Sequence, residues 1–509
     1  MAGAAISKLA VPWVPRASAQ GARTLTFALI NDVTTLDPFN TYDNVALSIE
    51  RAVYDGLVGF TPDMKVRPEL ATSWEASADA KTFTFHLRPN VKFHDGTPLN
   101  AAAVKLNFDR VRNPANKLIR QTFFDPISSI DAVNDTTVRF NLKAPFGAWL
   151  YTLAHPCSRI ISPAAIGKGG DFVARNMVGS GPFRFASWTP GQQVVLERNP
   201  EFWQSGQPEV DRLIIKPVPE DDSRVAMLLS GDAHFIYPVP NVQADAVSRA
   251  SGVTLQKQWS NVQQDAQMHC QHEPFRNPLV RQALNYAIDK QALVRVILGG
   301  LGRVMDSPVA SVITGYSVVQ AGGWPYDVAK AKTLLAQAGF PKGFETTMWL
   351  SNSTELLRLS EALQQMLAKV GVTVHLQAME LGTLMAIRFK PIDQNQTQMN
   401  LNGWSSATGD ADWALRPIFD SHAWPPTFNN IAFYKNPQVD ALLAAGLATA
   451  DQAKRNKVYA EASQIIWNDA PHVFLYTPQT LAGTHGGATG VWALPDLSCD
   501  FREASLGQG

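Results

Sequence analysis

Cysteine is scarce in this sequence, which has 509 residues and three cysteines, at positions 157, 270 and 499. They lie far apart and form no C-x-x-C pair, so the pattern argues against a zinc site or a dithiol redox centre. An odd count leaves at least one free or intermolecular thiol. One disulfide is possible, and the sequence does not select a pair.

The chain also lacks a long apolar run and an excess of either charge. No segment approaches the ~18 uninterrupted apolar residues of a membrane-spanning helix. Lys plus Arg and Asp plus Glu both total 44, so the charge gives no reason to expect binding to nucleic acid or to an anionic membrane. With 45% hydrophobic and 17% charged residues, the composition is that of a globular protein. The length suggests about three domain-sized units.

The N-terminal segment resembles part of an export signal. Ala17-Ser18-Ala19 is an A-x-A cleavage pattern, which predicts a mature chain that starts near Gln20. Two prolines and a lysine interrupt the preceding apolar residues, so residues 1–19 are interpreted as a signal remnant or as a signal whose start lies upstream. A disordered tail is the alternative. No cysteine lies near the cleavage point, so we expect a soluble periplasmic protein without a lipid anchor.

Residues 398–426 form the stretch with the clearest binding features. Met399–Gly403 alternates as a strand, and Ser405–Gly409 is small, polar and turn-prone. Asp410 or Asp412 can then cap a short helix, Trp413–Phe419. A hydroxyl-rich loop between a strand and a helix N-terminus can hold a small polar ligand. A capped helix with two core tryptophans explains the same residues equally well.

Several ordered motifs carry a resemblance to a known family. These motifs are Leu70–Trp74, Phe83–Arg88, Val91–Leu99, Gly179–Phe183 and Phe275–Leu284. Together they resemble the peptide- and nickel-type solute-binding proteins of ABC importers, a family that includes oligopeptide-, dipeptide- and glutathione-binding receptors. The resemblance covers nearly the whole mature chain.

The resemblance implies an α/β fold of the two-lobed periplasmic binding protein type (class II, type C). It predicts a first lobe made of residues 20–57, 178–266 and 478–509, an inserted domain at 58–177 and a second lobe at 267–477. The hinge is expected in two crossing strands near Ala266–Cys270 and Val473–Tyr476. The residues themselves predict alternating helices and strands in the C-terminal half, with one long helix from Pro278 to about Leu298.

The ligand is predicted from one departure from the family pattern. In peptide-binding relatives, an aspartate three residues after a Gly-Trp pair holds the peptide ammonium, whereas here that position is Ala407. The run Gly403–Phe419 most resembles the glutathione-binding branch, with Asp410 where a glutamate is expected. We therefore expect glutathione or a short peptide. A non-peptide solute (an opine, an oligosaccharide or a metal chelate) is the alternative.

The predicted site combines residues of both lobes. Hydroxyls and backbone amides would orient the ligand, Asp410 would bind its ammonium, and Arg416 or Arg358 would bind a carboxylate in two-pronged fashion. The complete predicted set is Thr35, Tyr42, Asp43, Asn44, Trp404, Ser405, Ser406, Thr408, Asp410, Asp412, Arg416 and Arg358.

No catalytic or cofactor motif was found. The sequence has no G-x-S-x-G, H-E-x-x-H or Walker A pattern. His269 and His272 flank Cys270 at metal-like spacing, but they fall on the expected hinge strand, so no metal is predicted. A periplasmic hydrolase using Asp410 and Asp412 is a remote alternative. The prediction is a monomeric receptor, not an enzyme, without cofactor, whose partners are its ligand and the permease subunits of an importer.

Overall fold

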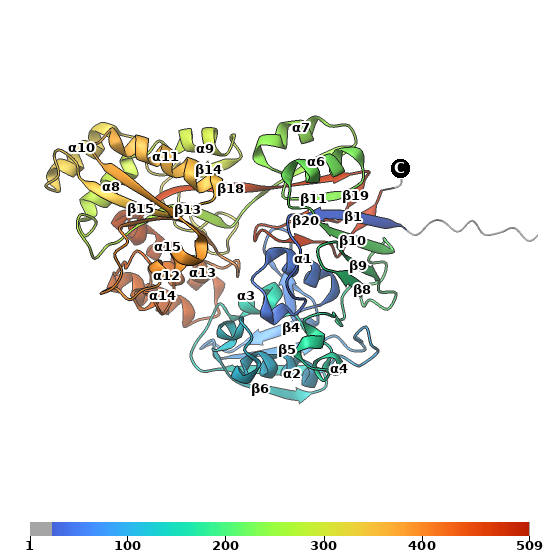
Figure 1. Cartoon of the computed structure of the whole chain (residues 1–509). Coiled ribbons are helices and arrows are strands. Elements are labelled where there is room, and N and C mark those ends of the chain that lie inside the picture. Colours follow the sequence, from blue (N-terminus) through green and yellow to red (C-terminus); the bar gives the residue numbers. More distant parts are fainter. Residues whose placement is uncertain (1–22, 508–509) are drawn as a thin grey trace, which may run out of the picture.

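The computed structural model describes residues 23–507 as two lobes joined by a long strand. One twelve-stranded sheet has the order β16-β15-β17-β13-β18-β11-β1-β10-β9-β8, with β12 and β14 also paired to β18. Figure 1 shows the two halves of this sheet in separate lobes, with β18 (His472–His485) running between them. The two-lobed α/β fold is therefore confirmed, whereas the domain boundaries stay a prediction.

The first lobe surrounds a mixed sheet in which β1 lies parallel to β10 and β11. Its elements are β1 (Thr24–Leu29), α1 (Asn44–Val53), β8 (Phe183–Thr189), β9 (Gln193–Arg198), β10 (Arg212–Pro217), α6 (Asp221–Ser230), β11 (Phe235–Tyr237), α7 (Ala244–Arg249) and β12 (Val253–Trp259).

The inserted domain contains a separate antiparallel sheet of order β4-β5-β7-β6. Its elements are β2 (Val58–Phe60), β3 (Val66–Pro68), β4 (Ala71–Ala76), β5 (Thr82–Leu87), α2 (Ala101–Arg112), β6 (Ile127–Asn134), β7 (Thr137–Leu142) and α3 (Trp149–Ala154). The alternation of polar and apolar residues from Thr82 to Leu87 predicts a strand, and β5 has these bounds. Asn100, before an apolar repeat, predicts an N-cap for α2, and its side chain accepts a hydrogen bond from the Ala103 amide at 3.0 Å.

The second lobe has helices on both faces of its sheet. Its elements are β13 (Val262–Met268), α8 (Pro278–Ala287), α9 (Lys290–Ile297), β14 (Gly302–Val304), α10 (Val328–Gln337), β15 (Glu345–Ser351), α11 (Thr354–Ala368), β16 (Thr373–Met379), α12 (Leu381–Arg388), β17 (Met399–Ser405), α13 (Ala411–Phe419), α14 (Pro437–Leu447) and α15 (Gln452–Asp469). None of the helices within residues 23–507 is both long and apolar enough to span a membrane.

The single long helix predicted from Pro278 to Leu298 is wrong, because the chain breaks between α8 and α9. Ile288 has an extended backbone, and the Asp289 side chain accepts a hydrogen bond from the Ala292 amide at 2.9 Å. Asp289 therefore acts as a new N-cap and starts a second helix.

One crossing between the lobes lies before its predicted position, and the other lies after it. β13 pairs with β17 from Val262 onward, so its whole length belongs to the second lobe. β18 pairs with β13 up to Tyr476 and with β12 from Gln479. β14 of the second lobe also pairs with β18, up to Pro478. The crossings therefore fall at residues 260–261 and 478–479. From the sequence, His472–Tyr476 is predicted as a short strand, and it is only the first part of the fourteen-residue β18.

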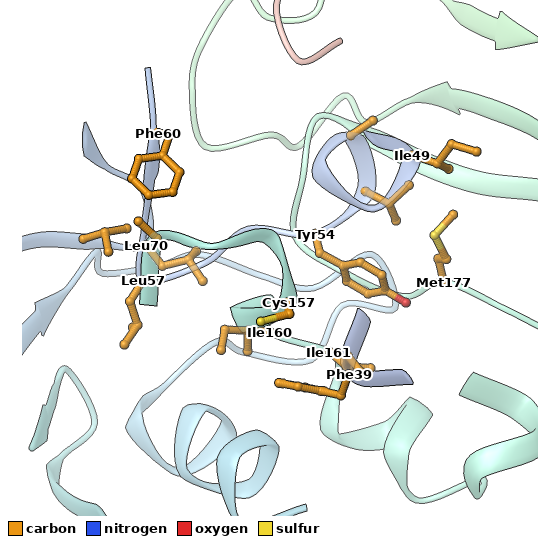
Figure 2. Close-up of a cluster of buried hydrophobic side chains, with 14 of the residues drawn as sticks. Phe39, Ile49, Tyr54, Leu57, Phe60, Leu70, Cys157, Ile160, Ile161 and Met177 are labelled. Atoms are coloured by element: carbon orange, nitrogen blue, oxygen red, sulfur yellow. The ribbon is translucent and has the colours of Figure 1, made fainter. Parts of the chain in front are cut away.

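The first lobe and the inserted domain share one continuous hydrophobic core. Figure 2 shows its junction, where Tyr54, the residue after α1, lies near Cys157 and Ile161 of the inserted domain. The second lobe has two cores, one on each face of its sheet. The inserted domain is therefore packed on the first lobe through a continuous core, and we expect the two to move together.

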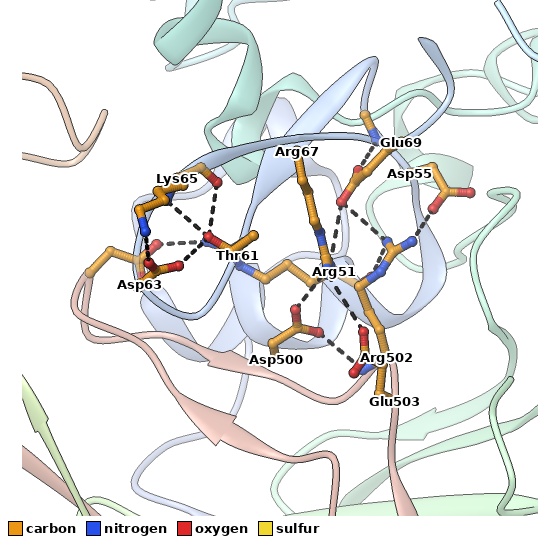
Figure 3. Close-up of polar contacts among 12 residues, drawn as sticks. Arg51, Asp55, Thr61, Asp63, Lys65, Arg67, Glu69, Asp500, Arg502 and Glu503 are labelled. Carbon is orange, nitrogen blue, oxygen red and sulfur yellow. Dashed lines mark hydrogen bonds and ion pairs between the residues drawn. The ribbon is translucent and has the colours of Figure 1, made fainter. Parts of the chain in front are cut away.

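A buried ionic network fixes the C-terminal segment to this rigid unit. Figure 3 shows Arg502 between Asp55 and Glu69, at 2.6 Å and 3.7 Å. Burial alone would raise the pKa of Glu69, but the guanidinium groups of Arg159, Arg502 and Arg67 lower it to about 2. The last residues of the chain therefore connect the first lobe to the inserted domain.

The three cysteines are free and buried. Burial raises the pKa of the Cys157 and Cys270 thiols to about 11 in each case, which keeps both as unreactive thiols near neutral pH. We expect a thiol reagent such as DTNB to react slowly with the native protein and to titrate all three thiols after unfolding. Rapid reaction of one thiol in the native state, or fewer than three thiols after unfolding, would contradict this arrangement.

Candidate ligand-binding site

Strand β17 leads into the predicted site with one edge open. All seven of its residues pair with β13, whereas β15 pairs with it only at Met399 and Asn400. Within residues 23–507, the part from Leu401 to Ser405 therefore has one neighbouring strand. Gly403 is exposed, and Trp404 is half-buried. An open strand edge can hydrogen-bond the backbone of an extended peptide.

Asp410 is the N-cap of α13. The sequence predicted that either Asp410 or Asp412 would cap this helix. The Asp410 side chain accepts a hydrogen bond from the Asp412 amide at 2.9 Å, and its backbone carbonyl accepts one from the Ser406 hydroxyl at 2.9 Å. The carboxylate is fully buried and forms an ion pair with Arg455 of α15. Burial raises the pKa of Asp410, and Arg455 opposes that shift.

This geometry favours a structural role for Asp410 over contact with a ligand ammonium. Its charge is already matched by Arg455, whose side chain is 1% exposed. No signal in the sequence indicated this role for Arg455, because no motif distinguishes an arginine in the first turn of a polar helix. The binding of a ligand by Asp410 stays a prediction.

The two arginines predicted to bind a carboxylate lie in different places. Arg416 donates to both oxygens of Asp412, at 2.9 Å from Nε and 2.7 Å from Nη2. Arg358 is exposed on α11, which packs on the opposite face of the sheet from α13 and Trp404. The structure therefore does not bring Arg358 to the other predicted residues.

Most of the predicted ligand-binding residues of the first lobe instead stabilise the local backbone. Asp43 caps α1 through the Val45 and Ala46 amides, at 2.7 Å and 2.9 Å. The buried Thr35 hydroxyl accepts a hydrogen bond from the amide two residues later. Asn44, the first residue of α1, is half-buried. Tyr42 differs, because 61% of its surface is exposed.

Arg120 is the functional candidate that the sequence analysis missed. Its guanidinium lies 4.3 Å from the centre of the Tyr42 ring and 5.2 Å from that of Phe123. Its Nε donates to the Thr41 carbonyl at 2.7 Å. In residues 23–507, neither terminal nitrogen has a protein hydrogen-bond partner. This cation is held between two rings with both outer nitrogens free, so it can bind a ligand carboxylate in a fork geometry.

Aromatic rings connect this arginine to the second lobe. The Phe123 and Trp413 ring centres are 5.0 Å apart, and the Trp413 ring stacks on Trp404 at 6.4 Å. The Trp404 Nε1 donates to the Trp413 carbonyl at 2.8 Å. The structure therefore brings Tyr42 and Trp404, both predicted from sequence, to the two ends of one aromatic cluster between the lobes.

The remaining hydroxyls of the loop are mostly engaged. Ser405 donates to the Asn261 side chain at 2.7 Å. Thr408 is 3% exposed, and its hydroxyl oxygen has no hydrogen-bond partner in the described part of the chain. Thr408 is therefore the loop residue whose hydroxyl is most available to a ligand or a bound water.

The possible metal ligands are explained by packing and capping. The His269 and His272 rings stack in parallel at 3.9 Å, and His269 also stacks on Phe433. Asp420, His422 and Asp440 place three possible ligand atoms within 4.8 Å of one another. Both carboxylates already accept hydrogen bonds, from His422 and from Ser421. We assign no metal to either group.

Comparison with known proteins agrees with this architecture. The model of the bacterial extracellular solute-binding proteins, family 5 (middle part), matches residues 65–425. The glutathione-binding protein GsiB of Pectobacterium atrosepticum is 40% identical over 487 residues, which are 95% of this chain and 94% of that protein.

Two solved structures show the same fold. HbpA2 of Haemophilus parasuis has a TM-score of 0.87 and 26% identity over 95% of this chain and all of its own. AgaA of A. tumefaciens R10, in complex with agropinic acid, has a TM-score of 0.76 and 30% identity over 96% of this chain and 99% of its own. The chain belongs to the bacterial extracellular solute-binding proteins of family 5.

Proposed function

We propose that the protein is a periplasmic receptor that binds glutathione or a short peptide between its lobes and delivers it to the permease of an ABC importer. The observation that carries the proposal is the identity of 40% to a glutathione-binding protein over 95% of this chain. The open edge of β17 and the free guanidinium of Arg120 supply matching chemistry. The export signal on which the location depends falls outside the described residues.

The site chemistry suits a small peptide with a free carboxylate. Arg120 offers two donors in a fork that matches a carboxylate, and it is only 5% exposed, so an ion pair there is shielded from water and strengthened. The Leu401 and Asn402 carbonyls already accept hydrogen bonds from Arg388 and Gln264, so the backbone of β17 beyond Asn402 is the part that can bind a peptide amide. Glutathione carries its ammonium beside a free carboxylate and away from its peptide amide. Ala407 therefore agrees with a ligand whose ammonium is placed differently from that of an ordinary peptide.

We infer that the protein has no catalytic activity of its own. The hydrolase alternative needs Asp410 and Asp412 to act as acid and base on a substrate. Asp410 is instead paired with Arg455, and Asp412 with Arg416. Both carboxylates are almost fully buried, so neither is placed to reach a substrate.

An opine is the second candidate ligand, because AgaA was solved with agropinic acid. A thermal-shift screen separates the two candidates. A ligand that binds only the folded state raises its stability by about 2.7 kcal/mol at a hundredfold excess over Kd. We expect glutathione or a di- or tripeptide to raise the melting temperature in a dose-dependent way, and agropinic acid and sugars to have no effect. A shift with agropinic acid alone would assign the receptor to opines.

A further inference from the structure

The inserted domain touches the second lobe along a seam distinct from the aromatic cluster. The Gly147 amide donates to the Leu447 carbonyl at 2.8 Å, and the Tyr151 hydroxyl donates to the Gln452 side chain at 3.2 Å. A Cβ atom added to Gly147 would lie 1.9 Å from the carbonyl oxygen of Thr449. The backbones of the inserted domain and the second lobe are therefore in direct contact along this seam, which forms only when the two parts are this close.

A pocket of about 240 Å³ opens on this seam. The inserted domain supplies one wall and the second lobe supplies the other; the lining residues are Pro126, Lys143, Ala144, Pro145, Phe146, Arg416 and Leu447. The two charged residues among them are both cations, and the other five are apolar. The pocket therefore combines an apolar interior with positive charge contributed by both walls.

Both cations have nitrogen atoms that can donate a hydrogen bond to a ligand. Asp412 engages Nε and Nη2 of Arg416, whereas Nη1 has no hydrogen-bond partner within residues 23–507. The Arg416 guanidinium also lies 5.8 Å from the centre of the Phe146 ring, which holds it beside the pocket. Lys143 is exposed, and its ammonium has no protein partner in the described residues. An anion between these two groups would compensate the charge of Lys143 and could accept a hydrogen bond from Nη1 of Arg416, whose own charge is matched by Asp412.

We propose that this seam pocket binds a small organic anion with an apolar body, such as an aromatic carboxylate, and that the bound anion favours the closed arrangement of the lobes. The carboxylate would lie between Lys143 and Arg416, with the apolar part against Phe146 and the prolines. Since one wall belongs to each side, the pocket is complete only when the seam is formed. A ligand that needs both walls shifts the population toward the state that has them.

The anion must then be coupled to the transported solute, a consequence that rests on the proposed function. If both ligands bind the closed state better, each raises the affinity for the other by the same factor. The binding of the anion itself does not depend on what the transported solute is. The two parts of the proposal can therefore fail separately.

Benzoate, with benzamide as its neutral analogue, is the probe for the pocket. We expect calorimetry or ligand-observed NMR to show saturable benzoate binding, with benzamide at least tenfold weaker. Lys143→Glu, a change at an exposed residue, should abolish benzoate binding and leave the affinity for glutathione in benzoate-free buffer unchanged. Equal binding of benzamide, or undiminished benzoate binding by Lys143→Glu, would overturn the proposal.

A second variant tests the requirement for a formed seam. Gly147→Val places side-chain atoms where the Thr449 carbonyl lies and should prevent close contact. The circular dichroism spectrum of this variant should match that of the wild type, which shows that it is folded. We expect it to lose benzoate binding although Lys143 and Arg416 are both retained. In the wild type, saturating benzoate should lower the Kd for glutathione by the same factor as glutathione lowers the Kd for benzoate. Retained benzoate binding by Gly147→Val, or unequal factors, would contradict the coupling to closure.

Discussion

Asp410→Ala should lower the free energy of unfolding by about 3–5 kcal/mol. The change removes the partner of Arg455, whose guanidinium would stay buried and unpaired. Breaking a buried ion pair from one side typically costs this much, because the remaining charge cannot be hydrated. The same change also removes the N-cap of α13. Chemical denaturation of wild type and variant measures the difference.

Asp451→Ala is the matched control for this prediction. Asp451 caps α15 through the Ala453 and Lys454 amides, but it is exposed and forms no buried ion pair. Its removal should therefore cost much less stability. The double variant Asp410→Ala/Arg455→Met should recover part of the loss, because no charge is then buried alone. Near-wild-type stability of Asp410→Ala, combined with a large loss of ligand affinity, would instead place this carboxylate in the ligand-binding site.

Arg120→Ala should weaken ligand binding by about 2–5 kcal/mol, or roughly one and a half to three and a half decades in Kd. The free guanidinium nitrogens are the donors assigned to the ligand carboxylate, and their loss leaves that carboxylate desolvated without a partner. Arg120→Lys keeps the charge but not the two-pronged geometry, so it should give an intermediate Kd. Calorimetric titration with glutathione, or with whichever peptide the thermal screen selects, measures both changes.

Arg175→Ala serves as the control for Arg120, because Arg175 is an exposed arginine of the same inserted domain. It should leave Kd unchanged. Melting temperatures are needed for all three variants, since Arg120 also donates to the Thr41 carbonyl. An unchanged Kd for Arg120→Ala would remove this arginine from the binding site.

Local signals in the sequence were sufficient for most elements and for one part of the site. Alternation predicted β5 and β17, and a cap residue predicted the start of α2. For α13 the cap, Asp410, was one of two predicted alternatives, and the helix starts two residues before the predicted Trp413. Each of these signals acts within a few residues, so it does not depend on the fold. The break after α8 was missed because Asp289 was not recognised as a cap inside an apolar repeat.

Long-range contacts account for what the sequence did not predict. Arg455 meets Asp410 across 45 residues of chain, and Arg120 comes from the inserted domain to face Trp413 through Phe123. No spacing pattern connects such positions. Arg358 was chosen for its charge alone, and the sheet of the second lobe separates it from α13. Burial also explains why Asp410 was assigned to the ligand from the sequence. Its carboxylate could bind an ammonium, but in the structure it is buried and already paired with Arg455.

Small-angle scattering during a titration with glutathione tests the central claim most directly, because it reports binding and closure together. The inserted domain and the first lobe share one core, so closure is a movement of the second lobe against both. We predict that the radius of gyration falls in a saturable way as glutathione is added, and that the ligand-bound curve matches the arrangement described here, in which the seam is formed. A radius that does not change at saturating glutathione would contradict capture of the solute between hinged lobes.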